Sequence, residues 1–160
     1  MNATCQIEQC SKADYDYIVM NLPIFWDDQA PSMRAFHHPM IIHEFGNTAF
    51  VIKHQAEIIA YLFGFYAQTG AYAYTHLVAV RQGWRKQGLA KKLYLNFIEL
   101  ARKRGCTCIK AITRPYNARS IAFHTKLGMI LDGEPDEHGV PVVKGYGGPD
   151  EDRVVFGMGI

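Results

Sequence analysis

The segment from Ala71 to Thr113 constrains the fold of this chain more than any other. Residues 71–80 form a β-rich run that ends in four apolar residues, which is typical of a strand covered on both faces. Apolar residues then recur at helical spacing from Leu89 to Ala101, and a second β-rich run covers 106–113. With the helix and strand expected after them, the order from Tyr72 to Leu131 is strand, helix, strand, helix, strand, which predicts parallel pairing through right-handed crossovers. We therefore expect an α/β unit.

The rest of the chain extends this unit into one domain over residues 1–160. Helices are expected at 12–22, with Ser11 as the cap, at 27–37, where Pro31 interrupts the pattern, and at 116–128. Strands are expected at 4–10, 129–133 and 153–160, and a hairpin at 48–54 and 57–67 turns near Gln55. Because the hairpin adds antiparallel strands to the parallel pair, the predicted sheet is mixed.

Composition excludes several classes of protein. The net charge of +2 requires no polyanionic partner, so no nucleic acid is expected to bind. No apolar run approaches the ~20 residues of a membrane span, and the polar N-terminus is no signal peptide. A cytoplasmic protein with reduced thiols is therefore expected, without a membrane partner. The spacings C-x4-C and C-x-C match zinc sites poorly, so no metal is expected.

The stretch RQGWRKQGLAKK, residues 81–92, joins the buried strand to the best helix and carries five cations. The first turn of a helix leaves backbone N–H groups without partners, and these donors attract an anion. Gly88 has no Cβ, so a phosphate can approach the backbone closely. Cations here oppose the helix dipole by about 0.3–1 kcal/mol each when no anion is bound. The pattern favours a phosphate site, and a solvated basic surface is the alternative.

Two motifs of the chain resemble those of the GCN5-related N-acetyltransferases. The loop matches the family pattern [QR]-x-x-G-x-[GA] at Arg85, Gly88 and Ala90. A second stretch, RPYNARSIAFHTKLGM, is similar to the family's asparagine-containing helix; the matching residues are Asn117, Ser120, Phe123 and Gly128. The resemblance implies a mixed, mostly antiparallel sheet with a splayed parallel strand pair, flanked by helices.

The resemblance also implies acetyl-CoA as the acyl donor. Backbone groups of Val78, Ala79 and Val80 are expected to contact the pantetheine arm. The pyrophosphate is expected on the N–H groups of Arg85, Lys86, Gln87, Gly88, Leu89 and Ala90, with Lys91 near a phosphate. Asn117 is expected to bind the pantetheine, and Ser120, Phe123 and Lys126 to line the cofactor. Asn117 is equally suited to cap its helix.

The family often places a tyrosine, as the acid that protonates the departing thiolate, where this chain has His124. Asn117, Ser120 or Ile121, and His124 follow one helical stripe, so His124 faces the expected cofactor. An imidazole with a pKa of about 6.5 is protonated in about a quarter of molecules at pH 7. The alternative is a histidine that only packs beside the cofactor while water supplies the proton.

A base must also deprotonate the attacking amine. The strand before the loop offers Tyr74 and His76 where some family members have a glutamate, and Glu44 is a further candidate base. A partly buried, hydrogen-bonded His76 and an ordinary surface Glu44 are the alternatives. In this family the first helices shape the acceptor pocket, and Trp26 beside two acids at 24–28 suits a cationic amine. The alternative is that Trp26 and the two acids lie in a solvated turn and bind no acceptor.

These observations predict an N-acetyltransferase that moves an acetyl group to a primary amine by direct attack in a ternary complex. The acceptor, a small molecule or a peptide, and the length of the acyl group stay open. Members of this family often dimerise, so a homodimer is compatible with the resemblance. The alternatives are a non-catalytic acyl-CoA sensor and a basic module that binds nucleic acid or protein.

Overall fold

The computed structural model of the chain describes residues 5–160, which form two compact units. The first unit contains the described residues up to Phe65 together with Thr75–Leu100. The second contains Tyr66–Tyr74 and Ala101–Ile160. Strand β4 (Tyr72–Val80) and helix α5 (Leu89–Lys103) each pass from one unit into the other.

The first unit contains a sheet in the order β1 (Ile7–Gln9), β2 (Ala49–His54), β3 (Glu57–Tyr66) and β4. Strands β2 and β3 are antiparallel and form the predicted hairpin, whose turn residues Gln55 and Ala56 both have positive φ, 47° and 69°. Strand β1 pairs antiparallel with β2 and is shorter than the predicted strand 4–10. Thr4 of that prediction lies outside the described residues.

Short helices precede the hairpin in the first unit. They are α1 (Lys12–Met20), α2 (Leu22–Trp26), α3 (Ala30–Met33) and α4 (Met40–His43), with 3-10 turns η1 (Asp27–Gln29), η2 (Arg34–Phe36) and η3 (Gly46–Thr48). Pro23 and Pro31 lie in the first turns of α2 and α3. The helix expected at 27–37 is interrupted, and Pro31 lies in the first turn of α3, where proline lacks only an N–H that has no partner.

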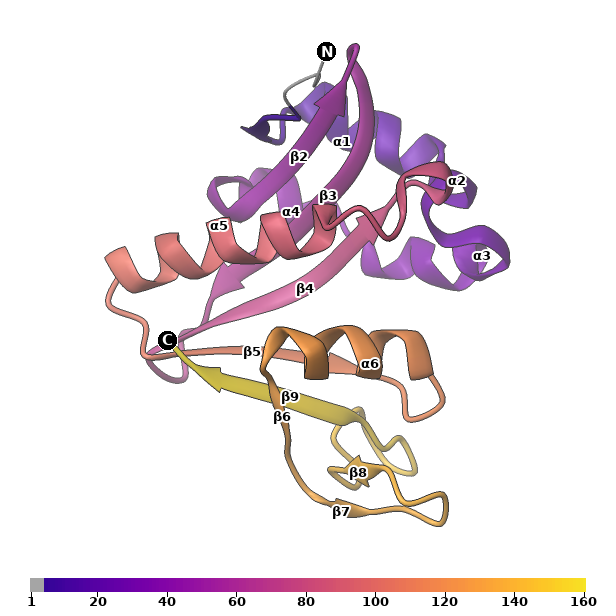
Figure 1. Cartoon of the computed structure of the whole chain (residues 1–160), viewed down its shortest axis with the longest axis vertical. Coiled ribbons are helices and arrows are strands. Elements are labelled where there is room, and N and C mark those ends of the chain that lie inside the picture. The colour runs from indigo at the N-terminus through magenta and orange to yellow at the C-terminus, as the bar shows by residue number, and fades with distance from the viewer. Residues whose placement is uncertain (1–4) are drawn as a thin grey trace. The chain divides into compact units, whose positions relative to one another are not determined.

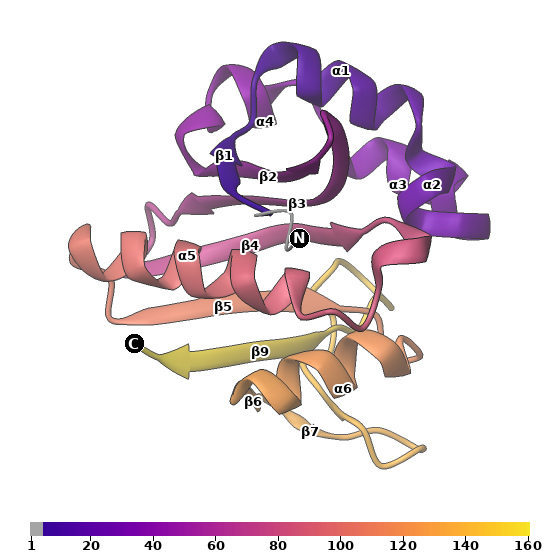
Figure 2. The same ribbon diagram turned by 45° about the horizontal axis from the view of Figure 1, so that its top comes forward.

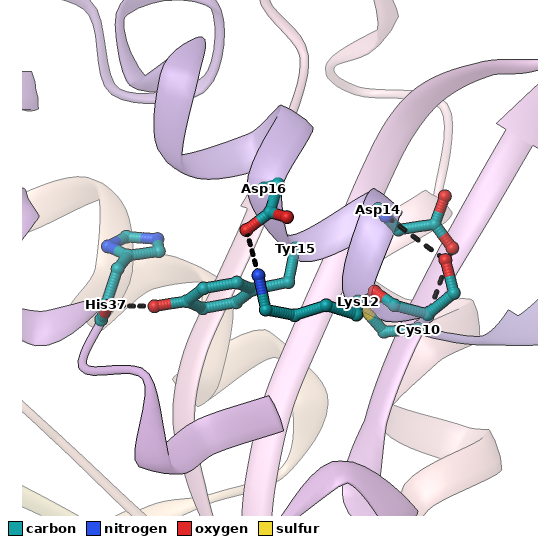
Figure 3. A network of polar contacts seen from close by, with 7 residues as sticks. Cys10, Lys12, Asp14, Tyr15, Asp16 and His37 are labelled. Carbon is teal, nitrogen blue, oxygen red and sulfur yellow. Dashed lines mark hydrogen bonds and ion pairs between the residues drawn. The ribbon is translucent and has the colours of Figure 1, made fainter. Parts of the chain in front are cut away.

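Helix α1 confirms the predicted cap at Ser11. The Ser11 hydroxyl accepts a hydrogen bond from the N–H of Asp14 at 3.1 Å, and the Ser11 N–H donates to the Asp14 carboxylate at 3.0 Å. One turn along, the Tyr15 hydroxyl donates to the carbonyl of His37 at 2.5 Å (Figure 3). This bond ties α1 to the segment that leads into α4.

The core of the first unit uses both faces of its sheet. Tyr15, Ile18 and Phe25 of the N-terminal helices belong to one buried cluster with Val51 and other residues of the strands. On the opposite face Phe50 packs against Phe97 of α5, with ring centroids 6.4 Å apart. In Figures 1 and 2, α5 lies along one face of these strands and α1 to α4 gather on the other. The alternation of a strand thus divides its apolar residues between two helical layers.

The second unit is built on the start of β4, then β5 (Cys108–Thr113), β9 (Val154–Gly159) and β6 (Ile130–Leu131). At the start of β4, the N–H of Thr107 donates to the carbonyl of Ala71 at 2.8 Å, and β4 and β5 run parallel. Strand β9 is antiparallel to both β5 and β6. The mixed α/β fold predicted from the sequence is therefore confirmed.

One detail of the predicted pairing is wrong. The strand–helix–strand order up to Leu131 predicted that the last of these strands pairs in parallel with its predecessor. Instead β9 separates β5 from β6, and Gly157 is opposite both Lys110 and Ile130. A two-residue β6 offers few ladder hydrogen bonds, whereas the six residues of β9 match the length of β5.

Helix α6 (Ala118–Leu127) lies along β9 in the second unit (Figure 1) and ends at Gly128, whose φ of +104° is left-handed. The loop after β6 contains a two-stranded sheet, β7 (Glu134–Pro135) and β8 (Pro141–Val142), that the sequence did not predict. The four cysteines are free thiols. Within residues 5–160, no helix combines the length and apolarity that crossing a bilayer requires.

Candidate cofactor-binding and active site

The loop between β4 and α5 has an irregular backbone that presents its amides. It begins with the 3-10 turn η4 (Gln82–Trp84), after which Arg85 is extended. Lys86 and Gly88 follow with left-handed φ values of +63° and +79°. A non-glycine residue in this region costs about 1–2 kcal/mol. The loop therefore keeps a conformation at Lys86 that local preference alone opposes.

Several backbone N–H groups of this loop make no hydrogen bond within residues 5–160. The first hydrogen bond of α5 runs from the N–H of Lys92 to the carbonyl of Gly88 at 2.9 Å. In the part of the chain that the structure describes, no acceptor is found for the N–H groups of Lys86, Gly88, Leu89 and Ala90, whereas those of Arg85 and Gln87 close the turns over residues 82–86. A Cβ built on Gly88 would meet nothing within 4 Å, so the space in front of these donors is open. Open amides of this kind are what the predicted diphosphate site requires, and that site stays a prediction.

The cations around the loop divide into two groups. Arg81 pairs with Glu57 at 3.3 Å, and the Lys92 ammonium donates to the carbonyl of Cys5. Lys86 and Lys91 are exposed and have no ion-pair partner among residues 5–160. Their charge is therefore available to an anion held by the loop.

The side chain of Arg85 makes three hydrogen bonds to residues of the first unit. Its Nε donates to the carbonyl of Val80 at 3.2 Å and its two terminal nitrogens reach the Phe25 carbonyl at 2.9 Å and the Asp27 carboxylate at 2.8 Å. The cofactor contact expected of Arg85 thus concerns its backbone. Sequence reasoning did not find its partnership with Asp27, because the two residues are 58 positions apart and no motif links them.

The three residues of β4 that are predicted to contact the pantetheine arm differ in how deeply they are buried. Ala79 is buried in the core, while Val78 and Val80 are half-buried. The Val80 carbonyl accepts from Arg85, as described above, and the next N–H, of Arg81, donates to the Ile59 carbonyl at 2.8 Å.

In the second unit, α6 brings three of the predicted residues together. The Asn117 side-chain oxygen accepts from the N–H of Ser120 at 3.1 Å, so Asn117 caps the helix. The amide nitrogen of Asn117 donates to the Thr113 hydroxyl at 3.1 Å. One turn later His124 Nδ1 lies 3.2 Å from the Ser120 hydroxyl and 2.8 Å from the Ser120 carbonyl. The helical stripe expected from the spacing is present.

His124 is buried, with 5% of its surface exposed. Its ring stacks on Phe156 of β9 at 4.4 Å between centroids. Because a carbonyl oxygen only accepts, Nδ1 carries the proton that bonds to Ser120. Burial lowers the pKa of His124 to about 4, against a smaller opposing effect of that hydrogen bond. With such a lowered pKa the neutral ring predominates at pH 7, and the ordinary pKa would leave about a quarter of the rings protonated.

The remaining residues predicted on α6 are more accessible. Phe123 is half-buried and meets the His124 ring edge-on, with centroids 5.1 Å apart. Lys126 is exposed near the C-terminal end of α6.

The two candidate bases lie in different settings within the first unit. His76 Nε2 donates to the Phe36 carbonyl at 2.8 Å, and the ring lies 6.4 Å from Phe36 and 6.3 Å from Phe65. Burial lowers the pKa of His76, although this hydrogen bond raises it slightly, so the ring is neutral at pH 7 with Nδ1 as the acceptor. Glu44 is exposed at the end of α4 and lines a surface cavity of about 420 Å³ that His76 does not line.

The indole ring of Trp26, which the sequence suggested for the acceptor pocket, makes a hydrogen bond within the first unit. Trp26 Nε1 donates to the Tyr61 hydroxyl at 2.6 Å, and that hydroxyl donates to His37 Nε2 at 2.7 Å. His37 Nδ1 in turn donates to the Met33 carbonyl at 2.8 Å, and burial lowers the pKa of His37 to about 4. Every polar atom of this buried chain has a partner. Sequence reasoning missed it, because neither His37 nor Tyr61 belongs to a motif.

Within the described residues, no group of three or more histidine, cysteine, aspartate or glutamate side chains could hold a metal ion.

Comparison with known proteins identifies the family. The model of the acetyltransferase (GNAT) family matches residues 12–129, so the chain belongs to the GNAT acetyltransferases, whose fold and family imply acyl-CoA-dependent acetyl transfer. A search of curated proteins finds no match.

Solved structures share the fold at low sequence identity. An acetyltransferase of the GNAT family from Desulfovibrio desulfuricans has a TM-score of 0.75 and 13% identity, and the match covers 98% of this chain and 99% of that one. A Bacillus subtilis acetyltransferase in complex with CoA has a TM-score of 0.65 and 17% identity, over 98% and 99% of the two chains. The ribosomal-protein-S18-alanine N-acetyltransferase of Escherichia coli has a TM-score of 0.65 and 17% identity, over 97% and 93%.

Proposed function

We propose that this protein transfers an acetyl group from acetyl-CoA to a primary amine by direct attack in a ternary complex. The observation that carries the proposal is the β4–α5 loop, where the N–H groups of Lys86, Gly88, Leu89 and Ala90 have no acceptor in the described chain. Two lysines without an ion-pair partner among the described residues flank them, and open space lies in front of Gly88. A protein that did not bind an anion here would gain by capping these donors.

Bound acetyl-CoA supplies the thioester that activates the acetyl group. We assign its diphosphate to the loop amides and to the ammonium groups of Lys86 and Lys91. The backbone of Val78 to Val80 is assigned to the pantetheine arm. On α6 we assign to the cofactor the Asn117 amide, the half-buried Ser120 and Phe123, and the exposed Lys126. Holding the thioester in one orientation supplies the proximity that direct transfer requires.

We assign the role of proton acceptor to His76. Its Nε2–H is occupied by the Phe36 carbonyl, which leaves Nδ1 with a free lone pair in the neutral ring. A lysine ammonium is neutral in only about one molecule in 2,500 at pH 7, whereas an α-amine with a pKa near 8 is neutral in about a tenth. A weak base such as a histidine with a lowered pKa therefore suits an α-amine better.

His124 is assigned a packing role rather than that of the acid. The N–H of the neutral ring donates to the Ser120 carbonyl, and because the pKa is lowered the protonated ring is a minor form at pH 7. Water then supplies the proton that the departing sulfur requires. This choice follows the second of the two alternatives that the sequence left open.

A single assay tests the proposal. The protein is incubated with acetyl-CoA and a panel of amines, and the free thiol is measured over time. The panel contains peptides with free N-terminal alanine, the acceptor named for the Escherichia coli protein, together with lysine and spermidine. We expect thiol release that depends on the amine, fastest with α-amines.

Two outcomes would replace the proposal. A protein that binds CoA in calorimetry without releasing thiol for any amine is an acyl-CoA sensor. A protein that does not bind CoA, but binds polyanions with a strong dependence on salt, is a basic interaction module.

A further inference from the structure

We propose that Asp27 is a positioning residue for the cofactor loop and sets the affinity for CoA through Arg85, without touching the cofactor. The inference rests on the proposed function of the β4–α5 loop. It concerns a residue far from the loop in sequence, at the junction of α2 and η1.

The contacts of Arg85 define the arrangement. Its guanidinium bonds to three acceptors, the carbonyls of Val80 and Phe25 and the carboxylate of Asp27. Two of the three belong to the end of α2 and the start of η1. Asp27 supplies the only negative charge among them, and its bond to Arg85 is both short and charge-assisted. Arg85 thereby fixes the residue directly before the open amides to the N-terminal helices.

The backbone on both sides of this ion pair supports the same conclusion. Asp27 has a φ of +53° and a ψ of −130°, which few residues other than glycine adopt. Lys86, immediately after Arg85, is also left-handed, at +63°. Such conformations persist when surrounding contacts fix them. The ion pair joins strained Asp27 to Arg85, the residue directly before strained Lys86, so it restrains the backbone at both positions.

Removing the charge of Asp27 should therefore disorder the amides that the diphosphate needs. In Asp27→Asn, Arg85 would retain only neutral oxygen acceptors, which hold a guanidinium less firmly than a carboxylate does. The loop would sample conformations in which the N–H groups from Lys86 to Ala90 diverge. Binding CoA would then require the loop to be ordered first, which raises the dissociation constant.

The test compares Asp27→Asn with Asp28→Asn by calorimetry with CoA. Both variants remove one negative charge from adjacent positions, and Asp28 has no ion-pair partner among residues 5–160. Asparagine also tolerates positive φ, so Asp27→Asn adds no backbone strain. We expect the Kd for CoA to rise about ten-fold or more in Asp27→Asn and to stay within about two-fold of the wild type in Asp28→Asn.

Kinetics distinguish positioning from a general loss of structure. In Asp27→Asn the main kinetic change should be a rise in the KM for acetyl-CoA that is larger than any fall in kcat. A damaged fold would lower kcat and the melting temperature instead. Arg85→Lys serves as the second variant, because lysine keeps the charge but cannot span three acceptors. It should raise the Kd to a similar extent, and the double variant should be no worse than either one.

Equal Kd values for Asp27→Asn and Asp28→Asn would overturn the inference and leave the proposed function intact. A loss of kcat without a change in Kd would also overturn it. A wild-type protein that does not bind CoA would instead remove the proposed function on which the inference depends.

Discussion

At the scale of single residues, Gly88 has the most direct effect on cofactor binding. Its φ of +79° favours glycine, and nothing lies within 4 Å of the position that a Cβ would take. In Gly88→Glu the carboxylate would extend into the space in front of the loop amides and repel a diphosphate. We expect calorimetry to detect no CoA binding, while circular dichroism shows a folded protein destabilised by about 1–2 kcal/mol.

Gly139 provides a matched control for this substitution. It is exposed, has the same φ of +79°, and a Cβ added there would also meet nothing within 4 Å. Gly139→Glu therefore adds the same strain and the same charge away from the loop. It should bind CoA as the wild type does. Normal binding by Gly88→Glu would rule out the loop as the diphosphate site.

His76 carries a second prediction at this scale. If neutral His76 accepts the proton of the amine, kcat/KM should rise with pH along an acid limb and level off. Because burial lowers the pKa of the ring below 6.5, the midpoint of that limb should lie below pH 6.5. His76→Gln should lower kcat by about 10²–10⁴-fold and abolish the limb. A His76→Gln variant with the wild-type pH profile would exclude His76 as the base.

At the scale of elements, α6 combines a structural and a proposed binding role in one residue. Asn117 caps the helix with its side-chain oxygen and donates to Thr113 with its amide nitrogen. Asn117→Asp keeps the capping oxygen but removes the amide donor, whereas Asn117→Ala removes both. We expect urea unfolding to show a loss of about 1 kcal/mol in Asn117→Ala and little change in Asn117→Asp.

CoA titration of the same two variants separates the roles. If the Asn117 amide binds the pantetheine arm, both variants should bind CoA more weakly. If Asn117 acts only as a cap, Asn117→Asp should bind CoA as the wild type does. That second result would confine Asn117 to its structural role.

The elements that the sequence predicted well are those whose pattern is local. The helical spacing from Leu89 to Ala101 and the hairpin around Gln55 needed only neighbouring residues, and both are present. The insertion of β9 between β5 and β6 was not predictable, because strand order depends on residues far apart in the chain. The ion pair between Asp27 and Arg85 was not predictable for the same reason. The lowered pKa of His124 likewise depends on Phe156 and the surrounding packing, which no helical stripe reveals.

At the scale of the whole molecule, buried histidines should limit stability in acid. His37 lies in the first unit and His124 in the second, and burial lowers the pKa of each to about 4 from 6.5. Between pH 6.5 and pH 4 the two histidines are protonated in the unfolded chain but stay neutral in the native protein. The free energy of unfolding therefore falls as the pH falls. Each ring contributes up to about 1.4 kcal/mol per pH unit, and nothing further is lost below pH 4.

Urea unfolding at pH 7, 6 and 5 measures this dependence, and His124→Phe isolates one of the two contributions. Phenylalanine keeps a ring that can stack on Phe156 but cannot be protonated, so the variant should lose stability less steeply below pH 6.5 than the wild type. His138→Phe, which replaces an exposed ring, should retain the wild-type slope. Since the native ring of His124 stays neutral over this range, the same variant should leave the pH profile of kcat unchanged. An altered kcat profile together with an unchanged unfolding slope would mean that the ring titrates in the folded protein, and would restore His124 as a candidate acid.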